Sequence, residues 1–322
     1  MSVSRANLIV GPARVVRGTG ISSTARNGSC YTRDAIKVDI VKEQVEIHTE
    51  AHGHVDYRDE DVLVKMTFSP AEWTANSRSL LWPYLTPEPG FAIFGATDTA
   101  TTIHDYNSHL HTIVASAVTK MPSLRLSVRE AMIGQCEITG VRKLASDWST
   151  ANSLYTVATT GGSFIDDTVT PFTIAGLKQE QYTGLFTGIT GLTAIQTMDG
   201  WTVDFDTKIS FQKIEESGTV KGTLVSTMVM AKCTPLAVSH ANLMAALRVD
   251  NSGFKRGQSA AATGADLVIT GASTGPVITL KNCDMKQAGY HFGASVLRDG
   301  EVGFVSTVPF ASSVAGAICT LA

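Results

Sequence analysis

The residues most able to do chemistry are His52, His54 and Asp56, which form an H-x-H-x-D string like the start of several metal-hydrolase signatures. Side chains two positions apart lie on one face of a strand, so two imidazoles and a carboxylate could face the same metal ion. The longer form of this signature continues with another His, and Tyr57 stands there instead. The string is therefore more typical of a polar turn in a β-hairpin, with a metal-dependent hydrolase as the enzyme alternative.

A second candidate is the segment 271–275, whose sequence GASTG matches the G-x-S-x-G motif of serine hydrolases. A nucleophile elbow needs a strand before the serine and a helix directly after it. Here Pro276 and the β-branched run 277–279 follow, so this segment is expected to be a turn between two strands. No other set of residues assembles into an active site. We expect a protein that is not an enzyme and that uses no metal or cofactor.

The composition is that of a folded globular chain. The 322 residues include 26 Lys and Arg against 29 Asp and Glu, a net charge of −3, and 43% are hydrophobic. A near-neutral balance argues against a tight grip on nucleic-acid phosphates. No run reaches the roughly 18 apolar residues of a membrane helix, and the N-terminus is too polar for a signal peptide, so we expect synthesis in a cytoplasm. The five dispersed cysteines are expected to be buried and reduced: Cys30, Cys136, Cys233, Cys283 and Cys319.

Alternating apolar residues and frequent turn signals predict a mainly β protein, a sandwich or barrel of many short strands. In 36–40 the apolar residues occupy even positions, whereas Val45 and Ile47 occupy odd ones. Since side chains alternate with a period of two, this strand needs a bulge or a change of packing partner. Only two short segments are typical of helices, Trp73 to Trp82 and His240 to Leu247.

An internal repeat is the most informative pattern in the sequence. Pro70 and Pro235 lie 165 positions apart, and the same offset superposes Val38-Asp39-Ile40 on Val203-Asp204-Phe205. The shared order of strand, bend, strand, Ser/Thr-Pro and short helix indicates a duplication. We predict two tandem related units, a first of residues 1–155 with an N-terminal arm and a more diverged second of residues 176–322, joined by a linker of residues 156–175. The alternative is two unrelated β regions that fall in phase.

A run of four charged residues lies between two predicted strands and consists of Arg58, Asp59, Glu60 and Asp61. Such a run is usually a solvated loop. The other interpretation is a loop that reaches a neighbouring subunit, because acid-rich hairpins both steer partners and repel DNA. We predict that these four residues make a contact between subunits.

The order of segments between residues 10 and 145 resembles the tail tube (major tail) proteins of long-tailed bacteriophages. The segments that carry the resemblance are an arm entering Gly11-Pro12-Ala13, a charged alternating strand from Asp34 to Glu50 that turns through 53–58, the run from Val62 to Trp73, the segment from Leu81 to Leu85, and a hairpin-like stretch from Thr102 to Pro122. The family implies a β-sandwich or barrel with a short flanking helix, assembled into stacked rings around a DNA-conducting channel. It implies no catalytic residues.

The resemblance also implies partners and a location. The chain would form a homo-oligomer in the virion tail and meet tape-measure, terminator and baseplate or tip proteins, while DNA passes without specific binding. An acidic first unit suits such a channel, and its acidic residues are Glu43, Glu46, Glu50, Asp56, Asp59, Glu60 and Asp61. Two fused units would let three chains complete a pseudo-sixfold ring, with six chains as the alternative. Another β-rich virion component, such as a sheath, tail-tip or capsid-decorating protein, is the alternative function.

Overall fold

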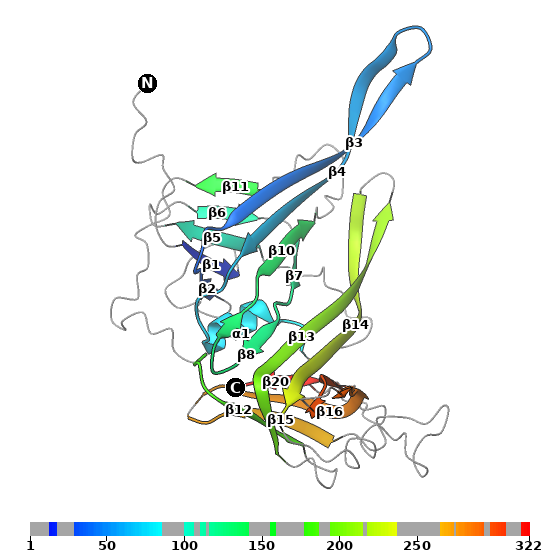
Figure 1. The fold of residues 1–322 in the computed structure, drawn as a ribbon. Helices are drawn as coiled ribbons and strands as arrows, with labels where there is room; N and C mark the ends of the chain where they lie inside the picture. Colours follow the sequence, from blue (N-terminus) through cyan, green and yellow to red (C-terminus); the bar gives the residue numbers. More distant parts are fainter. Residues whose placement is uncertain are drawn as a thin grey trace.

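The protein is mainly β, as the sequence predicts (Figure 1). The computed structural model describes residues 13–17, 29–85, 100–105, 110–113, 116–141, 155–158, 177–186, 194–214, 218–236, 265–273, 275–292, 297–306 and 317–322. Within these ranges twenty strands accompany one short helix. No helix among them is long and apolar enough to cross a membrane.

The first half of the chain forms two antiparallel sheets. Its elements are β1 (Ala13–Arg17), β2 (Ser29–Tyr31), β3 (Lys37–Thr49), β4 (Gly53–Phe68), α1 (Ala75–Leu81), β5 (Thr101–Asp105), β6 (Leu110–Ile113), β7 (Ser116–Lys120), β8 (Leu124–Leu126), β9 (Ala131–Ile133), β10 (Cys136–Val141) and β11 (Tyr155–Ala158). One sheet has the strand order β11-β6-β5-β1-β2 and the other β3-β4-β10-β7, while β8 and β9 add to the sheet of the second half. Because β11 pairs with β6 as far as Ala158, the first half extends three residues into the predicted linker. Residues 159–176 lie outside the described residues.

The second half closes into a barrel. Its strands are β12 (Tyr182–Phe186), β13 (Ile195–Ile214), β14 (Gly218–Pro235), β15 (Ala265–Gly271), β16 (Val277–Gln287), β17 (Tyr290–Phe292), β18 (Leu297–Asp299), β19 (Val302–Ser306) and β20 (Cys319–Leu321). The sheet order β12-β15-β16-β19-β14-β13 returns on itself because β12 also pairs with β13. Where β12 and β13 pair, the ring of six strands is closed and has no free edge.

Aromatic rings pack in the core of this barrel. The ring centroid of Phe304 lies 5.4 Å from that of Phe186 and 6.2 Å from that of Trp201, and all three side chains are buried. A Cβ atom at Gly184, on β12, would lie 2.4 Å from the indole of Trp201. The missing side chain at this strand glycine therefore makes the space that the largest core residue fills.

The helix predicted between Trp73 and Trp82 is confirmed as α1. Thr74 caps it: its hydroxyl accepts a 3.1 Å hydrogen bond from the Ser77 N–H, and the Ser77 hydroxyl accepts one of 2.8 Å from the Thr74 N–H. This reciprocal capping box satisfies two backbone donors at the helix start. Leu80 and Leu81 are fully buried. The second predicted helix, 240–247, lies outside the described residues.

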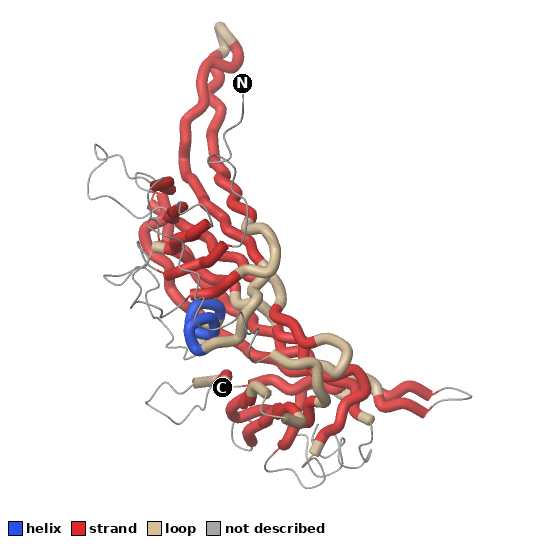
Figure 2. Tube along the Cα trace, turned by 90° about the vertical axis from the view of Figure 1, so that its left-hand side faces the viewer, coloured by secondary structure: helices blue, strands red, loops and turns tan. Residues whose placement is uncertain are grey.

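Two long hairpins, β3–β4 and β13–β14, extend from the sheets (Figures 1 and 2). Figure 1 shows both hairpins pointing upward and to the right, with the tip of β3–β4 higher than that of β13–β14. Each belongs to one half of the chain, so each half carries one projecting arm.

All five cysteines are buried, as predicted, and none of them forms a disulfide bond. Burial raises the pKa of the Cys30 thiol, with help from Glu72, and also that of Cys319, both to about 12. Burial likewise raises the pKa of Cys233 and Cys283. These thiols pack as small apolar side chains in the two halves.

Candidate assembly surface

The outer part of β3–β4 carries an exposed apolar surface. Val38 still packs against the core, and beyond it the hairpin stands free (Figure 2). Six large apolar side chains on this arm are 41–55% exposed: Ile40, Val41, Val45, Ile47, Val55 and Tyr57. Several exposed large apolar side chains on one hairpin suit a surface for contact with another macromolecule.

The ladder of β3–β4 contains two bulges. The register shifts between Glu43 and Gln44, where β4 carries Glu60 as an extra residue, and again nearer the tip, where Val55 is extra. The change of apolar phase between residues 40 and 45 predicts a bulge or a change of packing partner. The ladder does contain a bulge there, but its extra residue lies on β4, and the apolar residues on both sides of the shift, Ile40 and Val45, are exposed.

The charged run Arg58-Asp59-Glu60-Asp61 is not a loop, and that part of the prediction is wrong. It lies inside β4, where Arg58 pairs with Val45, and the turn of the hairpin is at 50–52. The run can form a strand because backbone pairing with β3, rather than side-chain burial, holds this arm together. The side chains of residues 59–61 lie outside the described part, and the predicted subunit contact stays a prediction.

The arm is strongly acidic. Residues 37–68 contain eight acidic and four basic residues, a net charge of −4 in a chain of net charge −3. Glu43, Glu46, Glu50 and Asp56 are all exposed on it. An arm with this charge repels phosphates at close range, within about 10 Å at moderate ionic strength.

The H-x-H-x-D string does not lie on one face of one strand. His52 is in the turn, and the bulged residue Val55 separates His54 from Asp56, which interrupts the alternation that would align them. The ring of His54 lies 4.3 Å from that of Tyr57, centroid to centroid, and the carboxylate of Asp56 accepts a 2.8 Å bond from the Tyr57 N–H. Among the described residues, no three His, Cys, Asp or Glu side chains form a group that could hold a metal ion.

The G-x-S-x-G segment is a turn between β15 and β16, as predicted. The Ser273 hydroxyl donates to the Glu180 carboxylate at 2.5 Å, and the Ser273 N–H donates to the same carboxylate at 3.1 Å. These bonds tie the turn to the segment before β12. The serine therefore has a structural partner and no strand-to-helix elbow.

The second arm, β13–β14, repeats the bulges of the first. Its register shifts between Lys208 and Ile209 and between Gln212 and Lys213, each 165 residues after a shift in β3–β4. The arms share the same register on both sides of these shifts. Sequence similarity between the arms is low, so their likeness lies in the backbone ladder.

The base of each arm is also built alike. Thr32 bridges Pro70 in the first half, and Thr197 pairs with Pro235 in the second, again at an offset of 165. In both halves the residue after the proline donates its N–H, at 2.9 Å, to the carbonyl of the residue before the threonine. The Ser/Thr-Pro pair that is repeated in the sequence thus marks a local structure that the two halves share.

The remaining strands correspond as well. β8 and β9 correspond to β17 and β18 at an offset of 166. The 2.8 Å hydrogen bond from the Gly134 N–H to the Ser123 carbonyl has its counterpart in the 2.6 Å bond from the Gly300 N–H to the Gly289 carbonyl. The sheet order β11-β6-β5-β1-β2 matches β20-β16-β15-β12-β13, and β3-β4-β10-β7 matches β13-β14-β19-β16. The two halves therefore share strand order throughout the part that the structure describes.

The halves are joined by strand addition. β8 of the first half pairs with β13 of the second, placing Leu124 opposite Val203 and Leu126 opposite Trp201, and all four residues are buried. Gly200 has a φ of +89°, and a Cβ there would lie 2.1 Å from the Leu126 carbonyl oxygen. A glycine is needed at this close crossing of two backbones. No local sequence signal points to this junction apart from the alternation Leu-Arg-Leu at 124–126.

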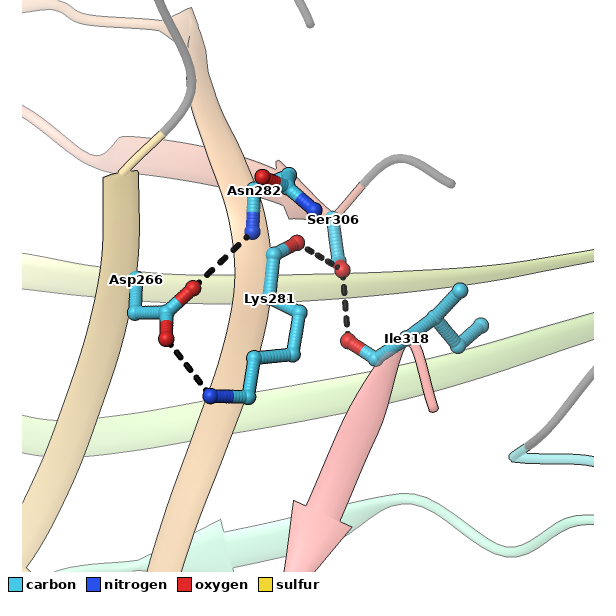
Figure 3. Close-up of polar contacts among 5 residues, drawn as sticks. All are labelled: Asp266, Lys281, Asn282, Ser306 and Ile318. Carbon is cyan, nitrogen blue, oxygen red and sulfur yellow. Dashed lines mark hydrogen bonds and ion pairs between the residues drawn. The ribbon is translucent and has the colours of Figure 1, made fainter. Parts of the chain in front are cut away.

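A polar cluster lies where β16 changes its pairing from β15 to β19 (Figure 3). The Asp266 carboxylate accepts bonds from Lys281 Nζ (2.6 Å) and the Asn282 N–H (3.2 Å), and Asn282 has a φ of +46°. The buried hydroxyl of Ser306 lies 2.5 Å from the Lys281 carbonyl and 2.6 Å from that of Ile318. These contacts stabilise the kink where β16 leaves β15 and pairs with β19. No motif in the sequence predicts this cluster.

No protein-family model matches the chain, and no curated protein matches it in sequence.

Proposed function

We propose that this protein is a tail tube subunit of a long-tailed bacteriophage, a structural protein that polymerises into stacked rings around a DNA channel. The observation that carries the proposal is the repeated projecting arm, with exposed apolar residues on the first copy and the same bulges in both. A subunit of a ring and stack needs surfaces that are incomplete in the single chain. The order of segments, which resembles that of tail tube proteins, is the reason for proposing a tail tube rather than another assembly.

We propose further that the chain consists of two tandem related units. Unrelated β regions share a strand order only by chance, and sharing register, two bulges and the Thr-Pro base as well is far less expected. Repeated units suit a closed ring, and three chains would supply six units.

The acidic charge of the β3–β4 arm is an argument for a channel through which DNA passes without being bound. Lys and Arg contacts to phosphates release counterions and hold the duplex, whereas a lumen of net negative charge avoids that term. The net charge of −4 on residues 37–68 is compatible with an arm near the channel.

Electron microscopy of the purified protein tests the proposal. We expect tubes or rings with an axial hole, and class averages of single rings with three chains in pseudo-sixfold arrangement. Particles that bind capsids without polymerising would favour a decorating protein and contradict the proposal. Monodisperse globules with about one zinc per chain, and an activity lost in His54→Ala, would favour the hydrolase alternative instead.

A further inference from the structure

We propose that copies of this chain join by strand addition, with β17–β18 of one copy pairing against the edge of β3 in the next. This deepens the proposed function, because it names the contact between chains in a ring. It rests on the assembly of copies and not on the passage of DNA.

The contact already exists once inside the chain. The β8–β9 hairpin of the first half adds to β13 of the second, with three residue pairs between 124–126 and 201–203. Trp82 reinforces it: its indole donates a 2.9 Å bond to the Pro122 carbonyl, and its ring lies 5.8 Å from Phe205 on β13. The junction is therefore a packed interface and more than three backbone pairs.

Both counterparts of this junction lack a partner strand within the described chain. β17–β18 corresponds to β8–β9 and forms a sheet of only two strands there. Residues 36–38 correspond to 201–203, and β3 is the outermost strand of its sheet, paired only with β4 on the side described. One half thus presents a donor hairpin and the other an acceptor edge, and a two-stranded hairpin alone is marginal in water.

The offsets fix the register of the new contact. Moving the β8 pairs by 166 and the β13 pairs by 165 places Tyr290 opposite Val38, His291 opposite Lys37, and Phe292 opposite Ile36. Both segments read apolar-polar-apolar, like Leu-Arg-Leu and Trp-Thr-Val at the internal junction. A slip by one residue would bring apolar positions to the polar face, so the pattern selects this register.

The acceptor edge is also guarded against other strands. Lys37 and Asp39 on β3 form a 2.8 Å ion pair, and both are at least one-third exposed. Charged residues on an edge strand discourage unspecific pairing. Because donor and acceptor are different surfaces, the contact is head to tail, the kind of contact that forms a ring when the rotation between copies closes.

Cysteine cross-linking tests the register. Opposed Cα atoms of an antiparallel pair lie about 4.5–5.5 Å apart, which suits a disulfide. The variant carrying Lys37→Cys and His291→Cys is oxidised after assembly and separated on a non-reducing gel. The matched control is Arg125→Cys with Thr202→Cys, the same pair at the internal junction, which should form an intramolecular bond. The five native thiols are buried and serve as background in the wild type.

We expect the first variant to give a ladder ending at the covalent ring, at least tenfold above either single variant, and the control to give only monomer of altered mobility. Assembled particles that yield monomer alone, while the control closes, would overturn the inference and leave the tube function standing. Cross-linked rings that never stack into tubes would support the inference and count against the tube function. Hydrogen exchange of the unmodified protein gives a second measurement: slowed amides in 36–38 and 290–292 on assembly support the contact, and unchanged exchange contradicts it.

Discussion

Replacing Gly200 by Ala should break the junction between the two halves. The new Cβ would lie 2.1 Å from the Leu126 oxygen and 2.4 Å from Ser127 Cβ, so the β8–β9 hairpin must move away from β13. A positive φ of +89° adds strain for any residue with a side chain, about 1–2 kcal/mol. Leu124 and Leu126 are both fully buried, and exposing a leucine costs about 1.5–3 kcal/mol each. Loss of the hairpin contact should therefore lower the free energy of unfolding by about 3–6 kcal/mol beyond the strain.

Gly53→Ala is the matched control. Gly53 also has a positive φ, +69°, but nothing lies within 4 Å of its Cβ position. Its substitution should cost only the strain, about 1–2 kcal/mol, at the tip of a free-standing arm. Urea unfolding of both variants measures the difference, and hydrogen exchange of 124–126 and 131–133 locates it. Equal unfolding free energies, with the β8–β9 amides protected as in the unmodified protein, would refute the reasoning.

Three further expectations concern the barrel core, the thiols and the charged run. Phe304→Ala should lower the free energy of unfolding by about 3–5 kcal/mol because it opens a cavity beside Phe186 and Trp201, while Phe211→Ala on the exposed arm should change it by less than about 1 kcal/mol, both measured by urea titration. The five buried thiols should not react with a thiol reagent until the protein unfolds. Because the pKa of Cys30 is raised from 9.0 to about 12 in the folded protein, the unfolded chain loses its thiol protons at lower pH. The free energy of unfolding should therefore fall as the pH rises above 9 and be unaffected by the thiols below it, which thermal melts at several pH values can check. Neutral isosteres at the charged run (Arg58→Gln, Asp59→Asn, Glu60→Gln, Asp61→Asn together) should leave a folded subunit that forms fewer and shorter tubes, and normal tube length in electron micrographs would contradict the predicted subunit contact.

Local patterns in the sequence predicted the features that local physics decides. The change of apolar phase between 40 and 45 located the first bulge of the β3–β4 ladder, although the extra residue lies on β4 and not on β3. Trp73 to Trp82, closed by Pro83, located α1. The matching Ser69-Pro70 and Thr234-Pro235 located the repeat, since a proline marks the end of a strand even where the neighbouring side chains of the two units differ.

Features that depend on distant parts of the chain were missed. The run 58–61 looks like a solvated loop because no core demands apolar residues on a free arm, and its partner β3 is needed to show that it is a strand. The docking of β8 on β13 joins residues some 75 positions apart and has only three residues of alternation behind it. The boundary at 155 was short for the same reason, since β11 is defined by its pairing with β6.

The internal β8–β13 junction has a consequence for mass action. Contacts between separate chains weaken on dilution, whereas this one joins parts of the same polypeptide and keeps a fixed effective concentration. Half of the strand-addition contacts in a ring of such chains would then be independent of protein concentration. Dilution would release whole chains with both halves still docked, and the smallest species in solution would already contain the template for the contact that it makes with others.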